Sequence, residues 1–135
     1  MAIEYSVSRD GHFIHAIASG CVTGDEFVEY EVAHAVDSRI KSPVSELLEI
    51  QSDALRQITK EDILRVIERR KELSTPHTLH RCAIVVESGG KHTWDLAKFY
   101  EGMSILHSLE VVIVFGDSRI ARIWLGIERM QPGFA

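Results

Sequence analysis

The 135-residue chain is poor in cysteine and has no long apolar run. Its two cysteines, Cys21 and Cys82, both fall in expected strand regions. They therefore indicate reduced core thiols rather than a disulfide framework. No apolar stretch approaches the ~20 residues that a transmembrane helix requires, and residues 1–6 have neither the cationic stretch nor the apolar core of a signal peptide. We expect a cytoplasmic protein without a membrane span.

Positive charge is also in deficit. The 15 Lys and Arg residues face 20 Asp and Glu residues, which gives a net charge of −5 with the histidines neutral. Such a chain is repelled on average by phosphate backbones and by anionic lipid surfaces, so we expect no nucleic-acid partner. The hydrophobic content of 45% is ordinary for a globular protein, and the length suits a single domain over residues 1–135.

The start of the chain predicts an antiparallel hairpin. Ile3, Tyr5 and Val7 alternate with polar residues, which is the pattern of a strand with one solvated face. The dipeptide Asp10-Gly11 follows and favours a two-residue type I′ turn, because both central positions of that turn need a positive φ. The second strand is expected at about residues 12–19.

Two capping boxes mark the starts of the next two helices. Thr23 and Glu26 stand three residues apart, so each side chain can bond the backbone amide of the other. Thr59 and Asp62 repeat this arrangement. The expected buried stripes are Val28, Val32, Ala35 and Val36 in the first helix, and Ile63, Val66 and Ile67 in the second.

Three stretches, residues 44–50, 82–86 and 111–115, predict further strands, and the last two are apolar throughout. Ser88-Gly89-Gly90 turns the chain into a third helix after the second stretch. Asp117 or Ser118 caps a fourth helix after the third stretch. The expected buried stripe of this last helix is Ile120, Ile123, Trp124 and Ile127, with Trp124 as a core residue.

The predicted element order is ββαβαβαβα. Four strand-to-helix turns in series require a largely parallel sheet with crossover helices that cover it. We therefore predict an α/β fold in which an N-terminal β-hairpin is followed by four β–α turns. The sheet is expected to be five-stranded, mixed and mostly parallel.

Several pieces of the chain carry a resemblance to a known fold. They are Gly20-Cys21-Val22-Thr23, Leu47-Leu48-Glu49-Ile50, Arg81-Cys82-Ala83-Ile84-Val85-Val86, and Val114-Phe115 leading to Ala121-Arg122-Ile123-Trp124-Leu125. With the hairpin and the four β–α turns, the chain resembles the STAS-like fold of bacterial anti-sigma-factor antagonists. More specifically, it is similar to small bacterial proteins near that fold and near the CRAL-TRIO lipid-binding fold.

The resemblance implies a non-catalytic regulatory or ligand-sensing module. The alternative that it implies is a small binder or carrier of an acyl or other amphipathic ligand. Antagonists of the classical type carry a regulatory phosphoserine after the third strand, in a turn that contains glycine. Residues 51–55 of this chain read Gln-Ser-Asp-Ala-Leu instead, and the length leaves no room for the helical cap of full-sized CRAL-TRIO proteins.

Polar residues follow the carboxyl ends of the predicted parallel strands, where open α/β sheets bind ligands. Their hydroxyls, cations and nearby helix-start amides suit an anionic head group. The alternative is that these residues only cap helices or form a simple β–α turn. The candidate ligand-binding residues are Ser52, Ser88, Lys91, Ser118 and Arg119.

We predict no metal site, no cofactor and no catalytic residues. His77, His80 and Cys82 form an H-x-x-H-x-C run, but no second cluster offers the further ligands that zinc needs. The nucleophile elbow Gly-x-Ser-x-Gly is absent. A hydrolase that pairs a loop serine with His92 is the third functional reading, after the regulatory module and the acyl binder.

For partners, we expect a homo-oligomer, most simply a twofold dimer. Closed dimers are the commonest soluble assembly, and the opening hairpin leaves a sheet edge to protect. A protein partner or a small anionic or amphipathic ligand is the other expected partner.

Overall fold

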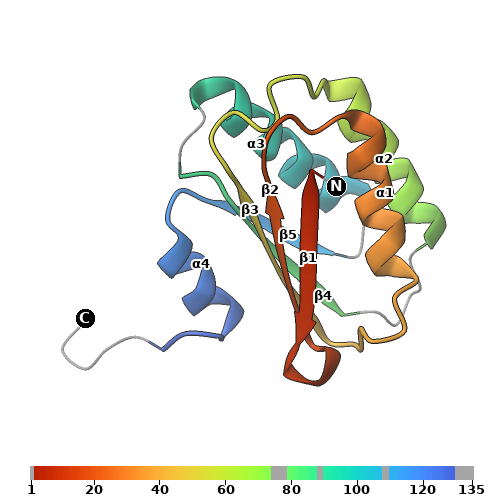
Figure 1. Ribbon diagram of the computed structural model, residues 1–135, viewed down its shortest axis with the longest axis vertical. Coiled ribbons are helices and arrows are strands. Elements are labelled where there is room, and N and C mark those ends of the chain that lie inside the picture. The colour runs from red at the N-terminus through yellow and green to blue at the C-terminus, as the bar shows by residue number, and fades with distance from the viewer. Residues whose placement is uncertain (1, 74–78, 88–89, 108–109, 130–135) are drawn as a thin grey trace.

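The computed structural model describes residues 2–73, 79–87, 90–107 and 110–129. The predicted positions His77, Ser88 and Gly89 lie outside the described residues. The elements, shown in Figure 1, are β1 (Ile3–Ser8), a 3-10 turn (Arg9–Gly11), β2 (Phe13–Ala18), α1 (Gly24–Ala35), β3 (Val44–Ile50), α2 (Lys60–Leu73), β4 (His80–Val85), α3 (Gly90–His107), β5 (Val111–Phe115) and α4 (Ser118–Leu125).

The five strands form one mixed sheet in the order β1-β2-β3-β4-β5. β1 and β2 are antiparallel, and β2, β3, β4 and β5 are parallel to one another. The predicted fold class is therefore confirmed: an N-terminal hairpin followed by four β–α turns. None of the described helices is long and apolar enough to cross a membrane.

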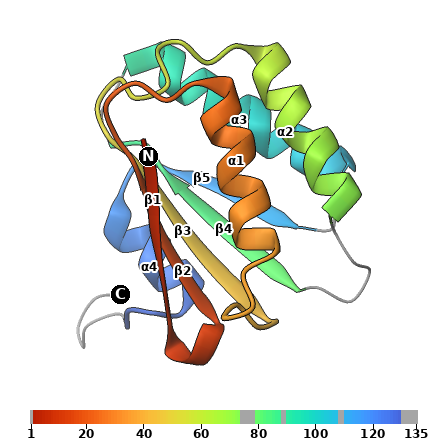
Figure 2. The same cartoon turned by 45° about the vertical axis from the view of Figure 1, so that its right-hand side comes forward.

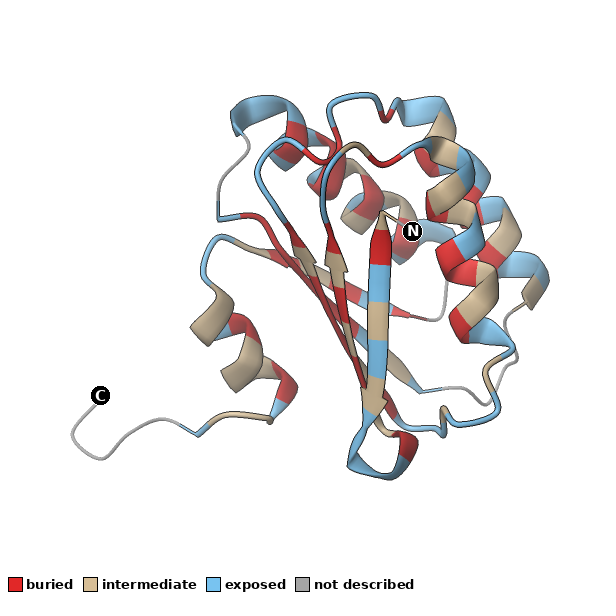
Figure 3. Cartoon of the chain, in the orientation of Figure 1, coloured by how far each residue is buried: buried red, intermediate tan, exposed pale blue. Residues whose placement is uncertain are grey.

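The helices cover the two faces of the sheet unequally. The parallel strands lie side by side in chain order, and parallel crossovers share one hand, so α1, α2 and α3 all pack on the same face (Figure 2). α4 alone packs on the other face, against β3, β4 and β5. Figure 3 shows the buried residues gathered where the sheet meets α1–α3. The sheet therefore has a larger core on one side and a small cluster on the other.

Local capping starts the helices as the sequence predicts. The Thr23 hydroxyl accepts from the Glu26 amide at 3.1 Å, while the Glu26 carboxylate accepts from the Thr23 amide at 3.0 Å. Thr59 and Asp62 make the same reciprocal pair. Asp117 caps α4 by accepting from the two amides that follow Ser118.

The prediction of a two-residue hairpin turn is wrong. Ser8 pairs with Phe13, so four residues form the loop. Arg9 and Asp10 adopt φ values of 54° and 57°, and Gly11 adopts 96°. The turn packs against the segment before β3, where the Gly11 carbonyl accepts from the Lys41 amide at 2.9 Å. This contact joins segments that are distant in the chain. The Asp10-Gly11 dipeptide alone therefore could not predict the wider turn.

The stripes predicted for α1 and α4 are also partly wrong. In α1 the buried residues are Phe27, Tyr30, Glu31 and His34, whereas the predicted Val36 is 68% exposed. In α4 the buried residues are Ala121 and Leu125. Ile120 is 45% exposed and Trp124 is half-buried, because α4 has only the small cluster on its side of the sheet to pack against. The α2 stripe of Ile63, Val66 and Ile67 is confirmed.

We predict that Gly11→Ala destabilises the fold by about 1–3 kcal/mol or more, the cost of a strained backbone conformation. A Cβ at Gly11 would lie 2.2 Å from the Arg39 carbonyl oxygen. Gly102→Ala in α3 is the matched control, because a Cβ there has no heavy atom within 4 Å and alanine favours a helix. Urea denaturation of both variants measures the effect. Equal stability of the two variants would contradict the assignment.

Candidate functional site

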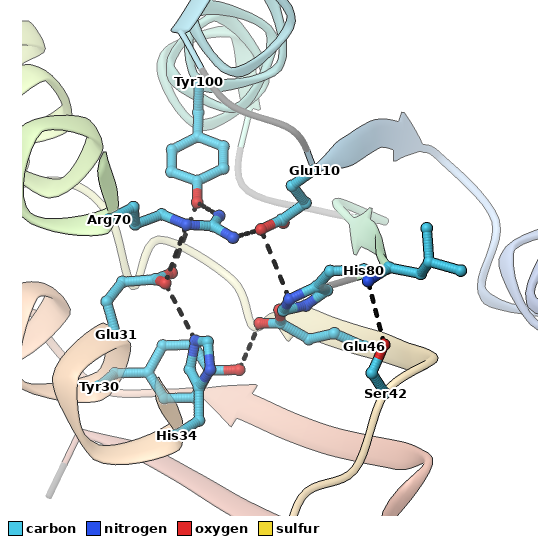
Figure 4. A network of polar contacts seen from close by, with 10 residues as sticks. Tyr30, Glu31, His34, Ser42, Glu46, Arg70, His80, Tyr100 and Glu110 are labelled. Atoms are coloured by element: carbon cyan, nitrogen blue, oxygen red, sulfur yellow. Dashed lines mark hydrogen bonds and ion pairs between the residues drawn. The ribbon is translucent and has the colours of Figure 1, made fainter. Parts of the chain in front are cut away.

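Nine polar or ionisable side chains lie between the sheet and helices α1–α3, near the amino ends of the parallel strands. Figure 4 shows how most of them converge. We call this group the polar network. Its members are Tyr30, Glu31 and His34 from α1, Glu46 from β3, Arg70 from α2, His80 and Cys82 from β4, Tyr100 from α3, and Glu110 just before β5.

The Arg70 guanidinium is the cation at the centre of the polar network. Its Nε lies 3.3 Å from Glu31 Oε2, and it also forms an ion pair with Glu110. It donates a hydrogen bond to the Tyr100 hydroxyl. All four residues are buried, so this cation joins α1, α2, α3 and the start of β5 inside the protein.

Two histidines extend the polar network towards β3 and β4. His34 Nε2 lies 3.0 Å from Glu31 Oε2, and His80 Nε2 lies 2.8 Å from Glu46 Oε1. The Tyr30 hydroxyl donates to Glu46 at 2.5 Å. The two imidazole rings themselves are 5.9 Å apart, centre to centre.

The protonation of these histidines decides the net charge of the polar network. Three buried carboxylates and one guanidinium leave a formal charge of −2, and protonation of both histidines brings it to zero. Burial by itself lowers the pKa of His34, but the Glu31 and Glu46 carboxylates outweigh burial and raise that pKa. Burial likewise opposes ionisation of Glu46, yet His34, His80 and Arg70 hold its pKa well below the usual range. A buried, uncompensated charge is costly, so the polar network favours a proton on His34.

Two trios of the polar network have ligand-type atoms within 4.8 Å of one another: Glu31, His34 and Glu46, and Glu46, Cys82 and Glu110. Arg70 already pairs with two of these carboxylates, and burial raises the pKa of the Cys82 thiol well above its usual value. A guanidinium in that position opposes a second cation. We therefore assign these groups to an ion-pair network rather than to a metal site.

An open pocket of about 500 Å³ lies at the amino edge of the parallel strands. We call it the amino-edge pocket. His80 belongs both to its lining and to the polar network. The other lining residues are Arg9, His12, Phe13, Pro43, Val44, Ser45, Leu79, Arg81, Val111, Leu125, Gly126 and Ile127.

The ionisable side chains of the amino-edge pocket are those of arginine and histidine, and none of the described residues that line it is acidic. Arg81 donates to the carbonyls of Trp124 and Leu125 at 3.2 and 3.0 Å, and Arg9 donates to that of Ile127 at 3.4 Å. The carbonyls at the end of α4 thus hold both arginines at the pocket.

The His12 ring has a fixed tautomer. Its Nδ1 lies 2.9 and 3.0 Å from the carbonyl oxygens of Lys41 and Pro43. Because both oxygens can only accept, Nδ1 carries the hydrogen. Nε2 is therefore the ring nitrogen that can meet a ligand.

The predicted carboxyl-edge site divides into two parts. Ser52 and Ser118 line one depression of about 370 Å³, together with Glu49, Glu87 and Arg122. The Ser118 amide donates to Glu87 at 2.8 Å, and the Ser118 hydroxyl donates to Glu49 at 3.0 Å. The depression is therefore lined by two carboxylates that already use the donors of Ser118.

Lys91 and Arg119 are not among the described residues that line this depression. The Lys91 ammonium forms an ion pair with Asp95 at 3.1 Å, and the Arg119 amide donates to Asp117. Ser88 lies outside the described residues. The structure thus brings Ser52 and Ser118 together, and the head-group role of the five residues stays a prediction.

Sequence reasoning missed the polar network, although a signal was present. Arg70 continues the α2 stripe three residues after Ile67, and Glu46 alternates with Val44 and Leu48 on one face of β3. Charged residues at core-facing positions of a helix or strand are uncommon unless they are paired. Such positions could have been marked as candidates for a buried ion network.

Comparison of the chain with known proteins found no relative. No family model matches it, and neither the curated proteins nor the solved structures yield a match.

We predict that the stability of the fold depends on the protonation of His34. Its pKa is raised above 6.5 in the folded protein. The stabilisation is therefore complete below that pH and is lost as the pH rises through the folded-state pKa. The free energy of unfolding should fall as the pH rises above 6.5, by at most about 1.4 kcal/mol per pH unit for one proton.

Urea denaturation of wild type and His34→Gln across this range isolates the contribution of His34, because the other histidines are common to both proteins. The variant should show the flatter dependence on pH. An unchanged slope would contradict the assignment of His34. Towards acid the sign reverses, because Glu46 has a lowered pKa and its stabilisation is lost as the pH falls below about 4.5.

Proposed function

We propose that the chain is a non-catalytic, ligand-sensing module that binds a small amphipathic anion, such as a medium-chain carboxylate, in the amino-edge pocket. The observation that carries this proposal is the combination of an apolar lining with two arginines and no carboxylate among the described lining residues. A volume of about 500 Å³ lies within the usual range of small-molecule sites.

The apolar part of the ligand needs a place outside the protein core. The cavity between β3, α2 and α3 measures about 10 Å³, which is too small for an acyl chain. The amino-edge pocket, in contrast, exposes apolar side chains at its rim. Leu79 is 68% exposed and Val111 is 50% exposed. An apolar ligand body that covers these side chains would remove their surface from water.

The anionic part of the ligand is suited to the two arginines. The carbonyl end of α4 carries a partial charge of about −0.5. Arg9 and Arg81 each carry a full positive charge, which outweighs it. The local balance therefore stays positive. Arg81 retains guanidinium hydrogens beyond the bonds that it makes to Trp124, Leu125 and Ser45. A carboxylate can accept a charge-assisted hydrogen bond from one of these hydrogens.

The contacts of the candidate nucleophiles support a non-catalytic role. The Ser118 hydroxyl is bonded to the Glu49 carboxylate rather than to a histidine. The Cys82 thiol is buried and its pKa is raised, which leaves it protonated and unreactive. The hydrolase reading would instead need a base in contact with one of these groups.

The proposal includes the resemblance to STAS-like proteins and the regulatory, cytoplasmic role that this resemblance implies. The hairpin followed by four β–α turns supports the resemblance. The open pocket also fits the second reading, an acyl binder without the helical cap of larger CRAL-TRIO proteins. A ligand bound at the pocket would alter the surface that a regulatory partner meets.

We predict that decanoate binds and that Arg9→Ala weakens this binding severalfold to about tenfold, the effect of one charge-assisted hydrogen bond. Isothermal titration calorimetry measures the affinity, with decanol as the uncharged comparison. Lys91→Ala is the matched control, because Lys91 lies at the opposite edge of the sheet and is 89% exposed. Thermal melting should be nearly unchanged in both variants.

The same titration distinguishes the two edges of the sheet. Binding that is weakened by Lys91→Ala or Arg119→Ala, but not by Arg9→Ala, would place the ligand at the predicted carboxyl-edge site. Equal affinity for decanoate and decanol would contradict the proposed recognition of an anionic head group.

We also propose a twofold dimer. β1 pairs only with β2 in the described sheet, so one edge of β1 presents backbone groups to a second strand. Light scattering at tens of micromolar should give about twice the chain mass of 15.2 kDa. A particle of the monomer mass would exclude the dimer.

A further inference from the structure

The amino-edge pocket and the polar network meet at one side chain. His80 lines the pocket, and its Nε2 lies 2.8 Å from Glu46 while its Nδ1 lies 3.7 Å from Glu110. We propose that binding of an anion in the amino-edge pocket is coupled to uptake of a proton by the polar network. The pocket would then hold its ligand more tightly as the pH falls. This inference rests on the proposed function and concerns the regulation of the same site.

Every element around His80 contributes a titratable or charged group. α1 and α2 supply both signs of charge, while β3 and the start of β5 supply carboxylates. The groups of the polar network are Tyr30, Glu31 and His34 from α1, Glu46 from β3, Arg70 from α2, Cys82 from β4, Tyr100 from α3 and Glu110 before β5. The pocket lining adds Arg9 and His12 from the turn before β2 and Arg81 from β4.

The charge balance gives the direction of the coupling. With His34 protonated and His80 neutral, the three carboxylates and Arg70 leave the polar network with a formal charge of −1, and a ligand anion at His80 brings another negative charge to the same place. A proton on His80 relieves this repulsion, which is weakly screened inside the protein. The ligand and the proton therefore favour each other, and the linkage is reciprocal.

His80 is also the point at which the polar network approaches water. Its side chain is 11% exposed, compared with 6% for His34 and 1% for Glu46. His34 is the next ring inward, 5.9 Å away. The pocket thus adjoins the titratable group that the solvent reaches first, and a ligand seated there covers it.

The test measures proton uptake directly. Decanoate is titrated into the whole protein by calorimetry at pH 7 in phosphate and in Tris, whose ionisation enthalpies differ. The difference between the two observed enthalpies gives the number of protons taken up on binding. We expect net uptake by wild type, and an affinity that weakens by up to tenfold per pH unit for one proton as the pH rises.

His80→Gln keeps a hydrogen-bond donor near Glu46 but does not titrate, so we expect decanoate binding with little or no proton uptake. His92→Gln is the matched control, since His92 begins α3 at the opposite edge of the sheet and bonds the Leu55 carbonyl. Its uptake should equal that of wild type. If His80→Gln does not fold, His80→Asn carries the same expectation, because it also removes the imidazole that lines the pocket.

The outcomes separate the inference from the proposed function. Decanoate binding without proton uptake by wild type, or with uptake that persists in His80→Gln, overturns the coupling and leaves the ligand site standing. Absence of decanoate binding from pH 5.5 to 8.5 overturns the proposed function and the coupling with it.

Discussion

Burial of three carboxylates around one guanidinium is the constraint on which the arrangement of the helices depends. Glu31, Glu46 and Glu110 come from different elements, and Arg70 of α2 pairs with two of them directly. Removal of one partner from such a buried group leaves an uncompensated charge, which typically costs about 3–5 kcal/mol. The positions of α1 and α2 relative to the sheet are therefore fixed by charge as well as by apolar packing.

The same constraint places ionisable side chains at the amino edge of the sheet. The polar network lies where the parallel strands begin, and its outer ring, His80, opens onto the amino-edge pocket. The arginines of that pocket are held by the carbonyls at the end of α4. The His80 imidazole therefore lies between the buried carboxylates of the polar network and the arginines of the amino-edge pocket.

The carboxyl edge of the sheet differs for a topological reason. Its strand order increases steadily from β1 to β5, so no reversal between neighbouring parallel strands opens a crevice of the kind that doubly wound sheets use. The depression that does form there contains Glu49 and Glu87, which bond the amide and hydroxyl of Ser118. A ligand at this edge would have to displace those contacts.

Most helix starts and strand bounds could be predicted because they depend on interactions between residues close in the chain. The capping boxes at Thr23 and Thr59 act within four residues, and the predicted strands at 44–50 and 111–115 have the predicted bounds. The hairpin turn failed because Gly11 packs against a segment about thirty residues away. The predicted burial of Trp124 and its neighbours in α4 was wrong because the hydrophobic cluster on that side of the sheet is small.

By itself, the sequence determined the element order, the helix starts and the α/β class, since each follows from neighbouring residues and from the hydrophobic pattern. Only the tertiary structure decided the candidate site. Glu31, Glu46, Arg70 and Glu110 are separated by up to 79 positions in the chain, and each alone would be expected at the surface. Their burial becomes favourable only when all of them meet, because ion pairing in a low-dielectric interior depends on distances that no local pattern records.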